Sequence, residues 1–369
     1  MKNQRIIWQN FDFLLFGAVL TLSILGIALI RSSIAGNIEL EGHPRRQTTF
    51  LLISLVVLFV VAALDYKFWI TLIYPMYLVT VAFLLFVLTA EARFGAVRWL
   101  EVGTILIQPA ELAKIVLILT LANFFANNKG KEPGIKTILL SLFILAGIVL
   151  WIFLQPNLST TIVLIVIWAA MLWIVGIKIR VILIAFGIVL LVLLIGAATG
   201  FSFLEEYQLK RITNFLFPDP DARYGETYNV DQALITIGTG GWFGQGYSQS
   251  SQVQLRFLKV RHTDFIFSVL AADFGFVGVA IVIGLLTLII IRCFKISQNA
   301  PDVFGSLIAY AFGFLIFFQS VVNIGVNINV IPVTGLTLPF VSYGGSSLLS
   351  LMLGIGLVES VAMRSTKND

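Results

Sequence analysis

Long apolar stretches recur along almost the whole chain, and they constrain its fold more than any other feature. The sequence has 369 residues, of which 59% are hydrophobic and only 12% are charged, about half the charged fraction of a soluble protein. Each stretch has about 17 to 25 residues, enough for an α-helix to cross a hydrocarbon core of roughly 30 Å. The chain is therefore predicted to be an integral membrane protein, and no segment could form a sizeable soluble domain.

These stretches predict an all-α membrane protein with ten transmembrane helices, organised as a single polytopic domain over residues 1–369. The first apolar run is too long for a signal peptide and lacks a clear small-residue cleavage site, so we expect an uncleaved first helix. An even number of spans puts both termini on one side. The expected spans are Phe11–Ile30, Thr48–Leu64, Phe68–Thr89, Pro109–Phe125, Thr137–Leu154, Thr160–Ile177, Val181–Phe203, Phe265–Ile291, Phe304–Val326 and Ser346–Met363.

The basic residues orient the predicted helices. With the N-terminus in the cytoplasm, the short inner loops are rich in Lys and Arg, as the positive-inside rule requires. The outer segments are longer, and the longest runs from Leu204 to His262 between the seventh and eighth spans. This loop has little helical or strand pattern, but its aromatic residues argue for order, and loops of this length are often functional. We therefore expect the functional face to be the outer one.

A polar run ends in Val-Arg-His-Thr-Asp, residues 260–264, and turns directly into the apolar run Phe265–Leu270. Asp264 therefore places a carboxylate where water meets the membrane. Such a group is costly to bury and is a functional candidate by default. Alternatively, Thr263 caps a helix and Asp264 occupies its first position, where an acid interacts favourably with the helix dipole. These residues alone leave both interpretations open.

The fourth span opens with Gln-Pro-Ala-Glu-Leu-Ala-Lys, residues 108–114. Pro109 suits the first helical position, and Glu111 falls in the first turn. Lys114 shares a helix face with Glu111 and lies about 7 Å inside the helix start. An unpaired ammonium group would be costly there, so a partner is expected, either Glu111 or an anionic ligand. The plainer interpretation is a capping acid and a snorkelling lysine.

Further cationic side chains lie on the predicted outer side. Arg46 precedes the second span, Arg98 lies in the next outer connection, and Lys210 and Arg211 lie in the long loop. Clustered guanidinium and ammonium groups suit a phosphate or diphosphate ligand. Anchoring to lipid headgroups is the alternative for the two arginines that flank the membrane.

Two glycine-rich segments require separate interpretations. Residues 236–246 superficially resemble a nucleotide-binding loop, but no strand precedes them and no βαβ pattern surrounds them. We expect a tight loop that passes close to other backbone. Residues 332–347 combine prolines and glycines within an apolar region, which predicts non-helical backbone that is buried in protein or lines a wet cavity. An ordinary re-entrant connector is the alternative there.

Metal ligands are sparse in the sequence. His43 and His262 stand alone among the outer residues, so no metal-ligand cluster is predicted. Asp219, Asp221 and Glu226 could bind a hard cation, but their surroundings are more typical of turns.

Three separated motifs, in this order, resemble the SEDS family of shape, elongation, division and sporulation proteins. They are Gln-Pro-Ala-Glu-Leu-Ala-Lys at 108–114, His-Thr-Asp-Phe-Ile-Phe at 262–267 and Pro-Phe-Val-Ser-Tyr-Gly-Gly-Ser-Ser at 339–347. The resemblance covers essentially the whole chain. The short N-terminal tail, Leu112 and the region of Tyr228 and Asn229 are more similar to the elongation members of the family than to the division members.

The resemblance implies a peptidoglycan glycosyltransferase that polymerises lipid II on the outer face of the bacterial cytoplasmic membrane during cell elongation. It implies a class B penicillin-binding protein transpeptidase as partner and no nucleic acid. Asp264 matches the essential aspartate of the family. The expected substrate-binding residues are Glu111, Lys114, Arg46, Arg98, Lys210, Arg211, His262, Thr263, Ser342, Gly344, Gly345 and Ser346.

Two positions depart from the family pattern. Asn157 stands where family members commonly have an aspartate, and Asn329 replaces a small or basic residue. A neutral amide cannot act as a base, so the resemblance does not support a catalytic or metal-binding role for Asn157.

Our hypothesis is an inverting glycosyl transfer in which Asp264 is the general base and a polyprenyl diphosphate leaves. A divalent cation, Mg²⁺ or Mn²⁺, could assist the leaving diphosphate, and no organic cofactor is expected. A lipid II flippase is the first rival; it needs a polar path across both leaflets, and the inner halves of the spans offer little beyond Asp12 and Asp273. The second rival is a non-catalytic scaffold that activates a transpeptidase.

Overall fold

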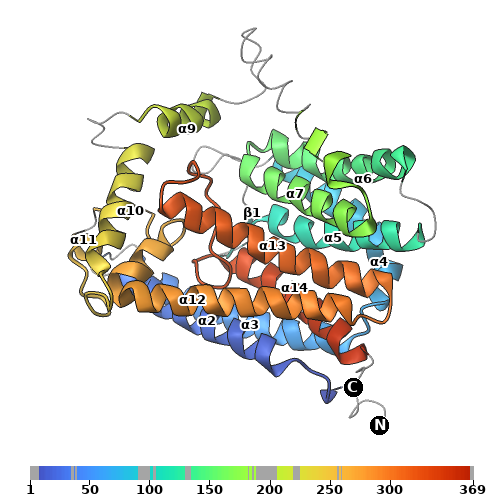
Figure 1. Cartoon of the computed structure of the whole chain (residues 1–369), viewed down its shortest axis with the longest axis horizontal. Coiled ribbons are helices and arrows are strands. Elements are labelled where there is room, and N and C mark those ends of the chain that lie inside the picture. Colours follow the sequence, from blue (N-terminus) through green and yellow to red (C-terminus); the bar gives the residue numbers. More distant parts are fainter. Residues whose placement is uncertain are drawn as a thin grey trace.

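The chain folds into a bundle of long helices. The computed structural model describes residues 8–34, 37, 40–89, 100–102, 105–128, 134–181, 183–184, 187, 206–218, 225–255, 257–258 and 260–365. Nine helices within these residues are long and apolar enough to cross a membrane (Figure 1). They are α2 (Phe13–Ser33), α3 (His43–Ala63), α4 (Phe68–Val87), α5 (Pro109–Asn127), α6 (Ile135–Leu154), α7 (Leu158–Val175), α12 (Ile266–Gln298), α13 (Val303–Asn327) and α14 (Gly345–Arg364).

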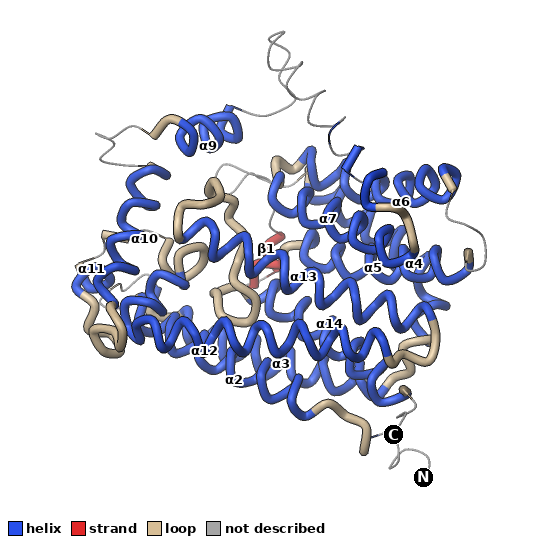
Figure 2. Tube along the Cα trace, in the orientation of Figure 1, coloured by secondary structure: helices blue, strands red, loops and turns tan. Residues whose placement is uncertain are grey.

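These helices match nine of the ten predicted spans, and the all-α prediction is confirmed. The other predicted span, Val181–Phe203, lies mostly outside the described residues, so the count of ten stays a prediction. One element was not predicted: strands β1 (Leu100–Val102) and β2 (Ile105–Ile107) pair antiparallel just before α5 (Figure 2). With three residues each, they are too short to produce a readable alternation of polar and apolar residues.

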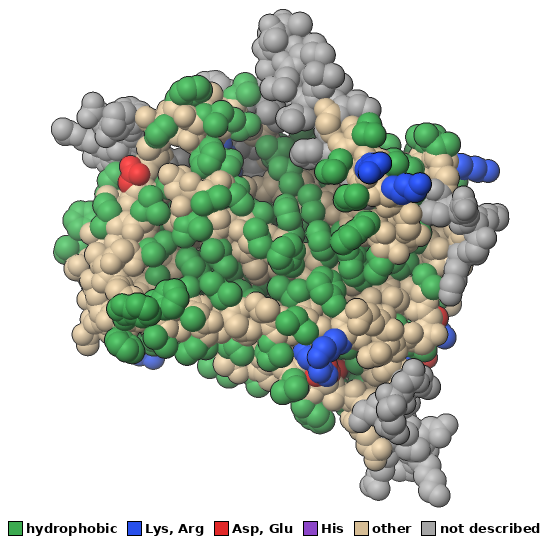
Figure 3. All heavy atoms as spheres, viewed as in Figure 1, with side chains coloured by type: hydrophobic (Ala, Val, Ile, Leu, Met, Phe, Trp, Pro, Cys, Tyr) green, Lys and Arg blue, Asp and Glu red, His purple; other side chains and the backbone are tan. Residues whose placement is uncertain are grey.

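The bundle has a clear centre. In their most apolar segments, α14 is 83% buried and α5 is 72% buried, whereas α4 is only 17% buried. Charged side chains on the face drawn in Figure 3 are few, and hydrophobic side chains cover much of it. A surface of this kind suits contact with lipid, so α4 belongs to the periphery and α14 and α5 to the core.

Glycines let the core helices approach one another, as small residues do in membrane bundles. A Cβ on Gly356 of α14 would lie 2.8 Å from the Leu58 carbonyl oxygen of α3. A Cβ on Gly26 of α2 would lie 2.6 Å from the Val341 carbonyl oxygen, in the segment before α14. Val341 is completely buried, so this segment sits directly on α2.

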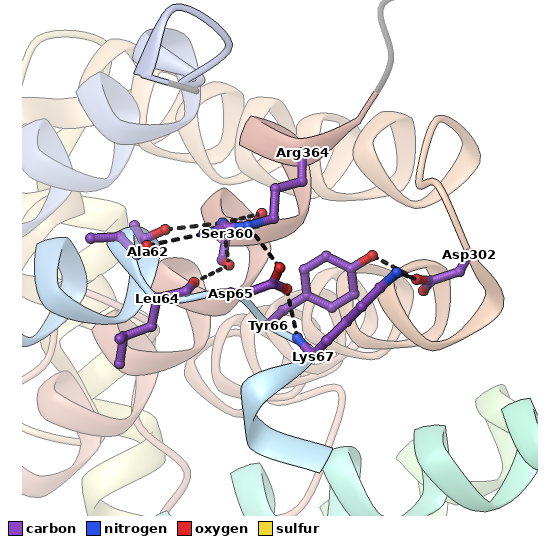
Figure 4. Close-up of polar contacts among 9 residues, drawn as sticks. Ala62, Leu64, Asp65, Tyr66, Lys67, Asp302, Ser360 and Arg364 are labelled. Atoms are coloured by element: carbon purple, nitrogen blue, oxygen red, sulfur yellow. Dashed lines mark hydrogen bonds and ion pairs between the residues drawn. The ribbon is translucent and has the colours of Figure 1, made fainter. Parts of the chain in front are cut away.

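The end of the bundle at which α14 ends carries an ion-pair cluster (Figure 4). Asp302 caps α13, and its carboxylate accepts hydrogen bonds from Tyr66 at 2.7 Å and from the Gly305 N–H at 2.8 Å. Lys67 Nζ lies 2.9 Å from Asp302 Oδ2. Burial raises the pKa of the Asp302 carboxyl, but these hydrogen bonds outweigh it and hold the pKa below its usual value. The cluster ties the start of α4 to the start of α13.

Arg364, at the end of α14, extends the same cluster to α3. Its guanidinium donates to the Ser360 carbonyl oxygen at 2.9 Å and to the Ala63 carbonyl oxygen at 3.0 Å, and it pairs with Asp65 at 3.4 Å (Figure 4). The carbonyl groups at the end of α3 thereby gain partners that the helix itself cannot supply.

A second polar network lies deeper at this end. Asp12 caps α2, accepts from Arg292 Nε at 2.7 Å, and donates its own N–H to Glu359 at 2.9 Å. Glu359 is completely buried. Asp273, by contrast, accepts a 2.5 Å hydrogen bond from Ser32 in the last turn of α2, the turn farthest from Asp12. The prediction that Asp273 lies in the inner half of the spans is therefore wrong.

The other end of the bundle carries the long loop. The described part of this loop contains α9 (Glu206–Leu216), α10 (Glu226–Gly240) and α11 (Ser251–Gln254), which gather at the left in Figure 1. The expectation of little helical structure is thus wrong for these residues, whereas order brought about by the aromatic residues stays a prediction.

Candidate active site

Asp264 lies in a series of turns, residues 260–265, immediately before α12. The helix begins at Ile266, and its N-cap residue is Phe265, which makes no side-chain cap. The predicted capping arrangement, with Thr263 as N-cap and Asp264 at the first helical position, is therefore wrong. Asp264 is partly exposed, so its carboxylate is available for a role other than ending a helix.

Two asparagines of α13 fix the main chain at Asp264. The Asp264 carbonyl oxygen accepts from Asn323 Nδ2 at 3.0 Å and from Asn327 Nδ2 at 2.9 Å. Asn327 Oδ1 also accepts from Ser268 Oγ at 2.7 Å and from the Ser268 N–H at 3.2 Å. Both asparagines are buried. The start of α12 is therefore attached to α13 through main-chain and hydroxyl groups.

The segment between α13 and α14, residues 328–344, passes directly beside this turn. Ser342 Oγ donates to the Thr263 carbonyl oxygen at 2.7 Å, and the Tyr343 N–H donates to the His262 carbonyl oxygen at 3.0 Å. A Cβ on Gly335 would lie 3.7 Å from Asp264 Oδ2. We call residues 328–344 the connector. Non-helical backbone was predicted for residues 332–347; it is confirmed for residues 332–344, of which residues 336 and 338–342 are buried, whereas residues 345–347 already belong to α14.

The backbone around Asp264 is conformationally strained. Val260 has φ +52° and Phe340 has φ +65°, in the left-handed region that bulky side chains rarely adopt. Gly335 has φ +77°, which its missing side chain allows. Strained residues of this kind persist only where their surroundings fix them, and they cluster at functional sites.

Gln47 of α3 joins the connector from another side. Its side chain accepts from the Gly344 N–H at 3.2 Å and donates to the Ser342 carbonyl oxygen at 3.4 Å. A Cβ on Gly345 would lie 2.4 Å from the Phe50 ring. Gly344 and Gly345 therefore hold the connector close to α3.

Glu111 and Lys114 form a buried ion pair at the start of α5. Lys114 Nζ lies 2.8 Å from Glu111 Oε2, and the two side chains are 1% and 11% exposed. Ser350 of α14 donates to the same Glu111 oxygen at 3.3 Å. The prediction that Lys114 needs a partner is confirmed, and the partner is Glu111. One turn earlier, the Gln108 N–H donates to Ser346 Oγ at 3.2 Å.

The other predicted cations are spread around this end of the bundle. Arg46 is exposed and lies close to Tyr343 of the connector. Arg211 of α9 donates to the Thr334 carbonyl oxygen at 3.3 Å, and Ser159 of α7 donates to the same oxygen. Lys210 is exposed on α9. Arg98 lies outside the described residues.

A pocket opens beside the connector, between α9 and α10. Its lining includes Arg211, Asn214 and Phe215 of α9, Asp231 of α10, and Asn329 of the connector. Amides, a guanidinium, a carboxylate and an aromatic ring suit a polar ligand that has apolar faces. Asp264 does not line it, but Arg211 contacts the connector one residue before Gly335, so the pocket adjoins the Asp264 turn.

The two departures from the family pattern have structural roles. Asn157 is buried and caps α7, since its Oδ1 accepts from the Thr160 N–H at 3.4 Å. Asn329 has φ +56°, a conformation that asparagine tolerates better than most residues. Asn and Asp cap helices about equally well, so the cap of α7 does not require a carboxylate at residue 157.

Within the described ranges, no three His, Cys, Asp or Glu side chains come close enough to hold a metal ion. Asp219 and Asp221, considered above as cation ligands, lie outside those ranges. The described donor set therefore does not fit a resident metal, and no step below is assigned to one.

The ring of His262 lies in a cluster with two other rings, those of His43 at the start of α3 and Tyr343 of the connector. It lies 5.3 Å from the ring of His43 and 5.8 Å from that of Tyr343. Burial, together with the nearby His43 and Arg261, lowers the pKa of His262 to about 4. The ring is therefore neutral at physiological pH.

The pKa of His262 predicts an acid-sensitive fold. The pKa of His262 is about 4 in the folded chain and 6.5 in the unfolded one, so the unfolded chain takes up a proton first. The folded state therefore keeps its full stability above about pH 6.5 and loses stability as the pH falls from about 6.5 towards about 4. From pH 7 to pH 5, we expect the free energy of unfolding to fall by about 1–2 kcal/mol more in the unsubstituted chain than in His262→Gln. Unfolding titrations in mixed micelles at both pH values measure this, and equal losses would contradict it.

The sequence interpretation missed several residues of this site, above all Asn323, Asn327 and Ser350. A signal for the asparagines was present: two amides, four residues apart on one face of an otherwise apolar span, are costly in lipid unless they face protein. Ser350 had no such signal, because small hydroxyl residues are common in membrane helices.

The fold defines a multi-pass membrane protein that gathers polar and charged side chains at one end of its bundle. The chain belongs to the family of cell cycle proteins that includes FtsW, RodA and SpoVE, whose family model matches residues 9–367.

Relatives from several bacteria are similar over nearly their full length. The peptidoglycan glycosyltransferase MrdB of Escherichia coli K12 is 32% identical over 97% of this chain and 96% of its own. A probable peptidoglycan glycosyltransferase FtsW of Coxiella burnetii is 34% identical over 98% of both chains.

Solved structures share the fold. A chain from a study of polymerization and crosslinking by a peptidoglycan synthase complex superposes with a TM-score of 0.80, at 31% identity, over 95% of this chain and 97% of that one. The rod shape determining protein RodA of Thermus thermophilus gives a TM-score of 0.72 at 28% identity, over 98% of this chain and 99% of its own.

Proposed function

We propose that this protein is a peptidoglycan glycosyltransferase that polymerises lipid II into glycan strands, with Asp264 as the general base. The observation that carries the proposal is the Asp264 turn. Its main chain is held by Asn323 and Asn327, while its partly exposed carboxylate lies beside Gly335 of the connector. A carboxylate on a rigidly held backbone is what a positioned base requires.

The chemistry follows from that placement. A sugar 4-hydroxyl is a weak nucleophile at neutral pH, and Asp264 accepts its proton as the oxygen attacks the anomeric carbon of the donor. The new glycosidic bond forms with inversion, and the bond to the polyprenyl diphosphate breaks. General-base assistance of this type contributes about 10² to 10⁴ in rate.

Cationic residues at the same end of the bundle support a diphosphate leaving group. Arg46 is exposed beside Tyr343, and Arg211 reaches the connector from α9. Fixed positive charges stabilise negative charge that develops in a transition state. Lys114 is paired with Glu111 inside the protein, so we assign it a place behind the site. A divalent cation arriving with the diphosphate stays a prediction.

Setting and partner are inferred from the same arrangement. We place the chain in the bacterial cytoplasmic membrane, with the Asp264 end facing outward and the Asp302 end in the cytoplasm, as the basic inner loops favour. We assign it the role of a cell elongation polymerase that works with a class B penicillin-binding protein transpeptidase. The polyprenyl tail can then remain in the bilayer while its sugars reach Asp264.

The inner polar residues argue against a flippase. Asp12 pairs with Arg292 and donates its N–H to Glu359, and Asp273 lies near the outer end of α2. The described residues at the inner end therefore form closed contacts and offer no evident polar path for a disaccharide.

The experiment is polymerisation of labelled lipid II by the purified full-length chain, alone and together with its transpeptidase. Glycan ladders on a gel would support the proposal. Scrambling of labelled lipid II across vesicles without polymer would favour a flippase. Absence of both, with stimulation of the transpeptidase, would favour a scaffold and overturn the proposed activity.

A further inference from the structure

The helix that follows Asp264 is broken once. Gly275, inside α12, has φ +64° and ψ −165°, which is not helical. Ile266–Asp273, before the break, are buried in protein, whereas Phe276 and Val277, just after it, are exposed. The part after the break has about 23 residues, enough to cross a bilayer alone. Residues 266–274 are therefore a separate half-helix that carries Asp264 at its start.

A break leaves the last carbonyl groups of the half-helix without helical partners. Residues 240–246, which we call the glycine loop, supply those partners. The Gln245 N–H donates to the Ala272 carbonyl oxygen at 2.8 Å, and the Gly246 N–H donates to the Asp273 carbonyl oxygen at 3.2 Å. The far end of the half-helix is thereby closed by backbone from another part of the chain.

The same loop serves the part of α12 after the break. The Phe276 N–H donates to the Gly241 carbonyl oxygen at 2.9 Å, and the Val277 N–H donates to the Trp242 carbonyl oxygen at 3.1 Å. Two donors and two acceptors of the glycine loop thus bridge the break from both sides. Helix interruptions in a membrane protein need such substitute partners.

The fit between the glycine loop and the break leaves no room for side chains. A Cβ on Gly244 would lie 2.2 Å from the Asp273 carbonyl oxygen, and one on Gly240 would lie 1.9 Å from the Ala271 carbonyl oxygen. A Cβ on Gly275 would lie 2.3 Å from the Gly244 nitrogen. All of these atoms belong to the backbone, so they cannot move aside as the end of a flexible side chain could.

The Asp273 side chain locks the assembly to a further helix. Asp273 is 1% exposed, and its carboxylate accepts from Ser32 Oγ of α2 at 2.5 Å. The half-helix is consequently fixed at its far end by α2 and the glycine loop, and at its near end by the two α13 asparagines.

We propose that the glycine loop is a positioning device for Asp264: by closing the break at Gly275 it sets the direction in which the half-helix presents the carboxylate to the substrate. The glycines touch no substrate and act through the half-helix. The catalytic part of the inference rests on the proposed glycosyl transfer, whereas the closure itself is independent of any reaction.

The test substitutes Gly244→Ala and, separately, Gly275→Ala in the full-length chain with its transpeptidase, and measures polymerisation of labelled lipid II. Because a shift of about 1 Å at a reacting group can reduce the rate by roughly 10²-fold, we expect kcat to fall by about 10- to 100-fold, with KM changed by less than about twofold. A rise in KM at unchanged kcat, or wild-type values of both, would overturn the proposal.

Two other glycines are matched controls. Gly238 of α10 and Gly284 of α12 have no heavy atom within 4 Å of a built Cβ. Gly238→Ala therefore adds the same methyl group to α10, which leads into the glycine loop, and Gly284→Ala adds it to α12, the helix that contains Gly275. Both should keep the wild-type kcat. A loss in the controls as large as in the two test variants would show that the glycine loop has no special role.

Amide hydrogen exchange separates this inference from the proposed activity. In the unsubstituted chain, the Phe276 and Val277 amides should be protected like those inside α12, and Gly244→Ala should release that protection. Rapid exchange at both amides in the unsubstituted chain would overturn the closure whatever the activity, even if the variants fail to fold. A chain that makes no glycan but shows this exchange pattern would refute the polymerase and retain the closure.

Discussion

Asp264→Asn is expected to reduce glycan polymerisation by about 10² to 10⁴-fold, because a neutral amide cannot accept the proton of the attacking hydroxyl. The fold should survive, since Asn323 and Asn327 bind the main-chain carbonyl of Asp264 and not its carboxylate. Gel analysis of labelled lipid II products measures the rate, and thermal unfolding in detergent checks the fold.

The matched control is Asp65→Asn. Asp65 is half exposed and pairs with Arg364 at the opposite end of the bundle, so the same chemical change there should leave the rate within about twofold of the original. Glycan ladders that persist unchanged in Asp264→Asn would eliminate the general-base mechanism. An equal loss in both variants would attribute the effect to folding.

Breaking the Glu111–Lys114 pair should give the second large effect. Glu111→Gln leaves the Lys114 ammonium, which is 1% exposed, without a counter-charge, and removal of one partner from a buried pair costs about 3–5 kcal/mol. Unfolding in mixed micelles should show this loss. Lys178→Met removes an exposed charge from the chain just after α7 and should change stability by less than about 0.5 kcal/mol.

The double variant Glu111→Gln/Lys114→Met separates stability from function. Removing both charges should restore stability to within about 1 kcal/mol, because apolar replacements of buried ion pairs are often neutral or stabilising. We expect the polymerisation rate to stay at least about tenfold below that of the unsubstituted chain, since in our proposal the pair lies behind the cationic residues that bind the substrate. Full recovery of the rate in the double variant would reduce the pair to a purely structural feature.

The hydrophobic pattern predicted most of the fold, because each helix must be long and apolar enough to cross a bilayer. It also placed the three motifs on one side, where the structure brings Gln108, Thr263 and Ser342 to the same end. The pattern could not show which helix faces meet. Contacts such as that between Asn327 and Asp264 join residues far apart in the sequence, and apolar periodicity contains no information about such pairs.

The break in α12 illustrates the same limit. Gly275 and Gly284 both lie in apolar sequence within one predicted span, yet only Gly275 is non-helical in this helix. What distinguishes them is the backbone of the glycine loop, which reaches one and not the other. A tight loop was expected over residues 236–246, but residues 236–240 form the end of α10. For residues 240–246 the expected close approach to other backbone was confirmed, but its target could not be read from the sequence.

The seat of the connector on α2 has a consequence for motion near the site. Phe340 and Val341 are buried, and the Val341 carbonyl lies against Gly26 with no room for a methyl group between them. Any shift of the connector at this point must therefore move α2 as well or open this contact.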